Sequence, residues 1–229
     1  MRISRRALLT SSVAMLAAGS ALGWLYHRPR SIGSADALVV DTDGILDLPY
    51  GYSYHILERA GELMNDGRPA PALPDGMACF RGTSGELILT RNHEIHEGNA
   101  ADSTLAYDSQ RAGGVSRLVV NARTGQRQAS NLLLTGTSRN CAGGPCPQGW
   151  LSCEEIDEPN HGYVFLCDPM ASTLQQANCL TSLGRFPHEA AAFDATTGTT
   201  YLTEDTTDSV IYKHVPTNPT TPFSDGTLL

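Results

Sequence analysis

The sequence predicts an all-β protein built from a repeat of short antiparallel strands. Three segments share one order: a short strand, a turn, a second apolar strand that runs into acidic residues, and a third strand. The third strands begin at Gly113, His161 and Asp208, 48 and 47 residues apart, a period typical of four-stranded propeller blades. No stretch of residues 38–229 has the periodicity of a long amphipathic helix. We therefore expect a β-propeller domain over residues 38–229, with about three to four blades.

Alternating apolar residues and the Gly, Pro, Asn and Asp turns between them predict the strands of each repeat. The first repeat comprises DGMACF (75–80), ELILTRNHE (86–94) and GGVSRLVVNARTG (113–125). The second comprises NCAGG (140–144), WLSCEE (150–155) and HGYVFLCDP (161–169). The third comprises HEAAAF (188–193), TTYLTED (199–205) and DSVIYKHVP (208–216). Three to four blades do not close the ring of a propeller. We therefore expect the N-terminal part of a larger propeller or a truncated product, with exposed edge strands.

Acidic residues follow the second strand of every repeat. They are Glu94 in the first repeat, Glu154 and Glu155 in the second, and Glu204 and Asp205 in the third. A single acid after a strand is more often a turn former, but equivalent strand ends in neighbouring blades surround one central channel. Carboxylates brought together there repel each other unless they are protonated or bridged by a cation. Because oxygen ligands suit calcium or ferric iron, the repeat predicts a metal site.

The cysteines do not follow a zinc-ribbon pattern, because the stretch RNCAGGPCPQGWLSCEE (139–155) lacks paired C-x2-C knuckles. We expect Cys79, within the apolar MACF, and Cys153, within a strand, to be buried among apolar side chains. Cys141 is different, because glycines follow it and carboxylates lie nearby in the sequence. It is either a metal ligand or, in an oxidising compartment, one half of a disulfide with Cys146 or Cys153.

Residues 1–37 are expected to be a targeting segment rather than part of the fold. ISRRALL (3–9) places a twin arginine before a weakly apolar run that ends at Leu25, which is typical of a Tat export signal. An ordinary Sec signal or an uncleaved anchor is the alternative, and Ala35-Asp36-Ala37 is a candidate cleavage site. We therefore expect export by the Tat machinery to the periplasm or beyond, with no stable membrane span unless the signal stays uncleaved.

The charge of the chain argues against a nucleic-acid partner. Beyond the first thirty residues, which hold five arginines and no acid, 11 basic residues stand against 24 acidic ones, a net charge of −13. A body this acidic repels a phosphate backbone and favours the binding of cations.

Long motifs spread over the chain after residue 45 resemble those of the PhoX alkaline phosphatases and PhoX-like proteins. They include LPYGYSYHILERAGELMNDG (48–67), GTSRNCAGG (136–144), WLSCEE (150–155), GRFPHEAAAFD (184–194) and YLTED (201–205). The resemblance implies a six-bladed β-propeller whose central channel holds an iron and calcium cluster that hydrolyses phosphate monoesters. Two features depart from it: PCPQGW (145–150) is one residue shorter than the family's segment and brings in Cys146, and the later blades are absent.

The resemblance also implies roles for single residues. Cys141 would ligate iron, and Glu155 and Glu189 match metal-binding carboxylates of the family. The repeat, rather than the resemblance, adds Glu94, Glu154, Glu204 and Asp205 to the expected metal site. Candidates for contacting the phosphate or for supporting the ligands are Arg139, Arg185, His188, His93 and Asn92. For these, pairing with the surplus acids or forming a local turn is the alternative.

Together these features predict an exported, PhoX-like hydrolase of small phosphorylated substrates. Iron and calcium ions would carry catalysis, and no Ser or Thr nucleophile is required. The alternatives are a non-catalytic, metal-stabilised propeller-like binding module, an inactive truncated remnant, or a metal-dependent hydrolase acting on a lactone or a phosphodiester.

Overall fold

The computed structural model describes residues 38–229, and the signal segment predicted for residues 1–37 lies outside them. The chain divides into two units between Tyr54 and His55. In the first unit, β1 (Leu38–Val39) pairs antiparallel with β2 (Leu48–Pro49). The only helical element of the described residues is the 3-10 turn η2 (Thr181–Leu183), so the all-β prediction is confirmed. No helix in this part of the chain is long and apolar enough to cross a membrane.

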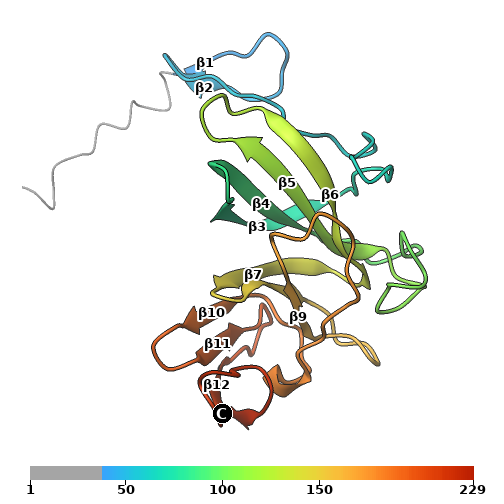
Figure 1. The fold of residues 1–229 in the computed structure, drawn as a ribbon, viewed down its shortest axis with the longest axis vertical. Coiled ribbons are helices and arrows are strands. Elements are labelled where there is room, and N and C mark those ends of the chain that lie inside the picture. Colours follow the sequence, from blue (N-terminus) through green and yellow to red (C-terminus); the bar gives the residue numbers. More distant parts are fainter. Residues whose placement is uncertain (1–37) are drawn as a thin grey trace, which may run out of the picture. The chain divides into compact units, whose positions relative to one another are not determined.

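Three antiparallel sheets make up the second unit, and in each sheet the strands pair in chain order (Figure 1). The first sheet contains β3 (Pro74–Arg81), β4 (Glu86–His93), β5 (Gly113–Asn121) and β6 (Arg127–Thr137). The second contains β7 (Asn140–Cys146), β8 (Gly149–Glu154) and β9 (Val164–Cys167). The third contains β10 (Ala191–Asp194), β11 (Thr199–Thr203), β12 (Ile211–Pro216) and β13 (Gly226–Leu228).

The repeat read from the sequence corresponds to these three sheets. The first strands of the repeats are β3, β7 and β10, the second are β4, β8 and β11, and the third are β5, β9 and β12. β5 begins at Gly113 as predicted, whereas β9 and β12 begin three residues after His161 and Asp208. His161 and Gly162 form a turn instead of strand, because Gly162 has a φ of 83° and donates its N–H to the carboxylate of Glu154.

The second sheet is buried on both faces. Trp150, Phe165 and Cys167 pack with apolar residues of the first sheet in one core. Leu151, Cys153 and Val164 pack with the third sheet in another core. All six residues of β8 are buried, because successive side chains of a strand point to opposite faces and here both faces are covered. The expected burial of Cys153 is confirmed.

Glycines allow the first strands of the three sheets to approach one another. A Cβ atom on Gly76 of β3 would lie 2.7 Å from the Cα atom of Ala142 in β7. A Cβ atom on Gly144 of β7 would lie 1.8 Å from the carbonyl oxygen of Ala191 in β10. Neither position has room for a larger residue, so β7 runs between β3 and β10 with its backbone in contact with both.

The prediction for Cys79 was wrong, since its side chain is exposed. β3 is an edge strand of the first sheet, and its residues alternate between two environments. Ala78 and Phe80 face the core between the first two sheets, so Cys79 lies on the opposite face. An apolar stretch on an edge strand therefore buries only every second side chain.

Candidate metal centre

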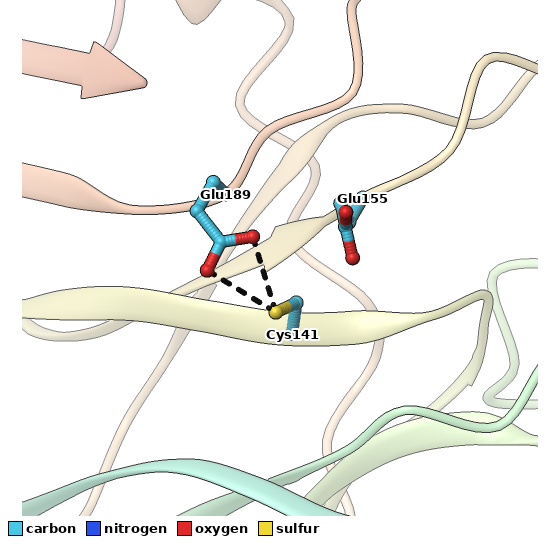
Figure 2. Close-up of side chains that lie close together, drawn as sticks. All are labelled: Cys141, Glu155 and Glu189. Atoms are coloured by element: carbon cyan, nitrogen blue, oxygen red, sulfur yellow. Dashed lines mark hydrogen bonds between the residues drawn. The ribbon is translucent and has the colours of Figure 1, made fainter. Parts of the chain in front are cut away.

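Three side chains of metal-binding type meet where the first strands lie side by side. They are Cys141 from β7, Glu155 directly after β8, and Glu189 two residues before β10. Their ligand atoms all lie within 4.8 Å of one another, and each side chain is partly buried. The Cys141 thiol donates to the Glu189 carboxylate, with Sγ 3.2 Å from Oε2 and 3.4 Å from Oε1 (Figure 2). The three residues implied by the family resemblance are thus brought together.

Backbone hydrogen bonds fix the three segments that carry these side chains. Glu155 donates its N–H to the carbonyl of Arg139 at 3.0 Å, and Ala142 donates to the carbonyl of Glu189 at 3.2 Å. His188 donates to the carbonyl of Glu154 at 2.9 Å. Each segment is therefore bonded to the other two, so the side chains are held at one point by paired backbone rather than by loose loops.

The surroundings of Cys141 and Glu155 disfavour the negatively charged forms of these two side chains. Burial raises the pKa of the Cys141 thiol, and the Glu189 carboxylate that accepts its hydrogen bond raises it further, as do the charges of Asp75 and Glu155. Burial and the charge of Glu189 also raise the pKa of Glu155. Ionised ligands that repel one another in this way are stabilised by a cation.

The donor set of this group fits iron. A thiolate is a soft ligand and carboxylates are hard ligands, and iron accepts both kinds. Deprotonation of the thiol is favoured beside a multivalent cation, which offsets the raised pKa. Calcium takes six to eight oxygen ligands, more than the two carboxylates of the group supply.

Three further acids surround the group without joining it. The charges of Glu94 and Asp205 contribute to the raised pKa of Glu155, and that of Asp75 contributes to the raised pKa of Cys141. Glu94 and Asp205 were predicted from the ends of the second strands, but Asp75 was not. A signal for Asp75 exists in the sequence, because Asp75, Cys141 and Glu189 each lie within the first two residues of the first segment of their repeat.

Arg139 lies between two of these acids. Its guanidinium Nη2 atom is 3.0 Å from Glu94 Oε1 and 3.6 Å from Glu155 Oε2, and 42% of the side chain is exposed. Its φ of 50° is one of three positive values outside glycine in the described residues. This conformation is costly for a residue that has a Cβ atom. It places the partly exposed Arg139 guanidinium at the edge of the Cys141, Glu155 and Glu189 group.

Glu154 lies outside the group although it is adjacent to Glu155. Its carboxylate is fully buried and accepts four hydrogen bonds, from His161 Nδ1 and from the N–H groups of Ser138, Gly162 and Tyr163. Glu204 is also outside the group, and its carboxylate accepts the N–H of Val210 at 3.4 Å.

The remaining candidates are engaged in other contacts. Arg185 binds Asp157 at 2.9 Å. His93 is buried between Ala72 O and Ser116 Oγ, each at 2.8 Å, and burial lowers its pKa to about 4. His188 is buried against the Phe186 ring, with its pKa likewise lowered by burial to about 4.

Asn92 contacts the strand that carries Cys141, because its side-chain amide bonds to the backbone of β7 at Cys141 and Ala142. The six cysteines all lie in the described part of the chain, and none is bonded to another. In the structure, Cys141 therefore forms no disulfide.

Comparison with known proteins identifies one family. The model of the family described as alkaline phosphatase PhoX matches residues 34–132 and 121–228. No curated protein and no solved structure matches the chain. The two matched regions together include all three sheets and the Cys141, Glu155 and Glu189 group. The chain belongs to the alkaline phosphatase PhoX family.

Proposed function

We propose that this protein is a metal-dependent phosphatase that hydrolyses phosphate monoesters. The observation that carries the proposal is the convergence of Cys141, Glu155 and Glu189 in a member of an alkaline phosphatase family. Cys141 and the two carboxylates would hold iron, and the surrounding charges of Asp75, Glu94 and Asp205 would favour calcium nearby. Bound cations would polarise the phosphoryl oxygens and stabilise the negative charge that develops in the transition state.

Arg139 would contact the phosphate of the substrate. Its guanidinium is shared between Glu94 and Glu155, so it is not free for an anion while both carboxylates are negatively charged and lack a cation. A cation on Glu155 would weaken that ion pair and leave the guanidinium for a phosphate oxygen, with which it forms strong bidentate hydrogen bonds. Substrate binding would then depend on prior binding of metal.

We extend the proposal to the fold and to the location of the protein. The three consecutive meanders, whose first strands lie side by side, support the interpretation that they are blades of a β-propeller. The twin-arginine segment within residues 1–37 supports export by the Tat machinery to the periplasm or the medium. A small phosphorylated molecule would be the substrate there.

The test is to purify the full chain, exported with its own signal, beside Cys141→Ala and a control, Cys79→Ala. Cys79 is exposed on β3 and outside the ligand group. Elemental analysis measures iron and calcium, visible absorption detects a thiolate-to-iron band, and p-nitrophenyl phosphate reports hydrolysis. We expect the band and the activity in the wild type and in Cys79→Ala. Cys141→Ala should lose the band and about 100-fold or more of the activity, since even the partners of ligands contribute 10–100-fold.

Two results would contradict the proposal. Bound iron and calcium without hydrolysis of any phosphate monoester would favour a non-catalytic, metal-stabilised binding module. A colourless wild-type protein without metal would contradict the proposed metal centre and favour the alternative of an inactive protein.

A further inference from the structure

The Asn92 side chain of β4 crosses from the first sheet into the second. It is fully buried, and its amide group makes four hydrogen bonds. Nδ2 donates to the carbonyls of Cys141 at 3.0 Å and Ala142 at 2.7 Å. Oδ1 accepts from Trp150 Nε1 at 2.8 Å and from Ser152 Oγ at 2.9 Å. Donors on one side and acceptors on the other fix the orientation of the amide.

The two carbonyls that Asn92 binds lie at an irregularity of β7. Asn140 pairs with Glu154, and Gly143 pairs with Ser152. Two residues of β7, Cys141 and Ala142, therefore oppose the single residue Cys153 of β8, which is the definition of a β-bulge. A bulge leaves backbone groups without partners in the ladder and redirects a side chain, and bulges are common next to active sites. Here the Asn92 amide supplies the missing donors.

Contacts on two sides hold the bulge. Gly76 of β3 packs against it, because a Cβ on this glycine would lie 2.8 Å from the Cys141 carbonyl oxygen. On the other side, a buried chain of donors supports Asn92. Thr137 donates to Asn140, Asn140 donates to Ser152, and Ser152 donates to Asn92. Every group in this chain is satisfied, which makes a buried polar network rigid.

We infer that Asn92 is the positioning residue for the Cys141 thiol: by holding the bulge at Cys141 and Ala142, it directs the thiol toward Glu189 and Glu155. Asn92 does not touch a ligand side chain and acts only through the backbone of β7. The inference rests on the proposed metal centre for its purpose, but the positioning itself is a property of the metal-free protein.

The experiment compares Asn92→Asp with Asn131→Asp. Asn92→Asp keeps the acceptor for Trp150 and Ser152 and loses the donors to β7. Asn131 is a matched control: it is 3% exposed, and its amide also donates to two carbonyls, those of Leu132 and Ala171, while Oδ1 accepts from Arg117. Neither Leu132 nor Ala171 is near a ligand in sequence, so this variant reports the effect of an aspartate at a buried site away from the metal centre, where Arg117 partly offsets its charge.

The first measurement uses the full chain freed of metal. Iodoacetamide alkylates Cys141 at a rate followed by mass spectrometry of its peptide. We expect Asn92→Asp to change this rate by about tenfold or more, and Asn131→Asp by less than about twofold, because only the first variant loses buried hydrogen bonds to the bulge that carries the thiol. Equal rates in the two variants would overturn the inference.

The second measurement titrates Co²⁺ and follows the thiolate-to-cobalt absorption band, which Cys141→Ala should lack. Asn92→Asp should weaken Co²⁺ binding by about 10–100-fold relative to Asn131→Asp, and equal affinities would again count against the inference. If the wild type shows no band, the proposed metal centre fails, while the alkylation rates still decide the role of Asn92.

If Asn92→Asp does not fold, Asn92→Ser replaces it, with Asn131→Ser as its control. This variant removes both amide donors to β7 and adds no buried charge. A Cys141 alkylation rate that differs from that of the control by about threefold or more supports positioning. Equal rates in the two variants overturn it.

Discussion

Glu58 is a fully buried carboxylate between two arginines. It binds Arg91 at 2.5 Å and also Arg127, and Ser130 Oγ donates to it at 2.7 Å. We expect Glu58→Ala to lower the free energy of unfolding by about 3–5 kcal/mol, because the largely buried Arg91 loses its carboxylate partner and Arg127 keeps only the more distant Glu62. Urea unfolding followed by the fluorescence of buried Trp150 measures this change.

The control for this prediction is Glu62→Ala. Glu62 is 42% exposed and lies 3.8 Å from the same Arg127, so its loss should cost less than about 1 kcal/mol. Similar losses in the two variants would show that the burial of Glu58 does not determine its contribution.

At the scale of single residues, the sequence predicted which residue types gather but could not decide between neighbours. Glu154 and Glu155 are equivalent in the repeat, and both were predicted as ligands. In the structure, the turn at His161 and Gly162 donates to Glu154 and keeps its carboxylate buried, while Glu155 joins Cys141 and Glu189. That choice depends on a turn several residues away, which no local pattern encodes.

At the scale of the strands, close packing of β7 against β10 depends on Gly144. A Cβ there would lie 1.8 Å from the Ala191 carbonyl oxygen, which is backbone and cannot rotate away. We expect Gly144→Ala to lower the free energy of unfolding by about 2–4 kcal/mol, the range of severe steric overpacking. The same change should displace Glu189, because Ala191 follows it by two residues, and so weaken Co²⁺ binding.

Gly85→Ala separates this steric effect from backbone strain. Gly85 has a φ of 85° and no atom within 4 Å of an added Cβ, so alanine there should cost only about 1–2 kcal/mol. Co²⁺ binding should be unchanged in this variant. Equal losses of stability in both variants, with unchanged Co²⁺ binding, would contradict the proposed role of Gly144.

The strands themselves were largely predictable, because each repeat alternates apolar residues between glycine-rich turns. The contacts between sheets were not. Nothing in the sequence distinguishes Gly76 and Gly144 from other glycines of the repeats, yet at both positions a neighbouring backbone occupies the space of a side chain. Such a contact joins segments about fifty or more residues apart and leaves no periodic trace in either of them.

At the scale of the whole molecule, the carboxylates gathered around Glu155 lower the free energy of unfolding when no metal is bound. The folded protein raises the pKa of Glu155 through burial and the charge of Glu189, with further contributions from Glu94 and Asp205 and an opposing one from Arg139. The folded state then binds a proton at Glu155 more tightly than the unfolded state does. Stability therefore begins to fall as pH rises past the ordinary glutamate pKa of about 4.3, and the loss is complete once the pH has passed the raised pKa of Glu155 in the folded state.

Glu155→Gln should thus have opposite effects on the free energy of unfolding of the metal-free and of the metal-bound protein. At pH 7 with a chelator, we expect the variant to be more stable than the wild type by roughly 0.5–1 kcal/mol, since a partly exposed repulsive charge is removed. With Ca²⁺ and iron at about a hundred times the dissociation constant, the wild type should gain about 2.7 kcal/mol. The variant lacks a ligand and should gain much less, so the order of stability reverses when metal is added.

Urea unfolding of both proteins, with chelator and with metal, measures the four free energies, and Glu62→Gln serves as the control because its carboxylate is outside the ligand group. In that control, metal should add as much stability as in the wild type. If Glu155→Gln is less stable than the wild type without metal, the net repulsion at Glu155 is refuted. If metal stabilises both proteins equally, Glu155 is not a ligand, and the cations that stabilise the fold bind elsewhere.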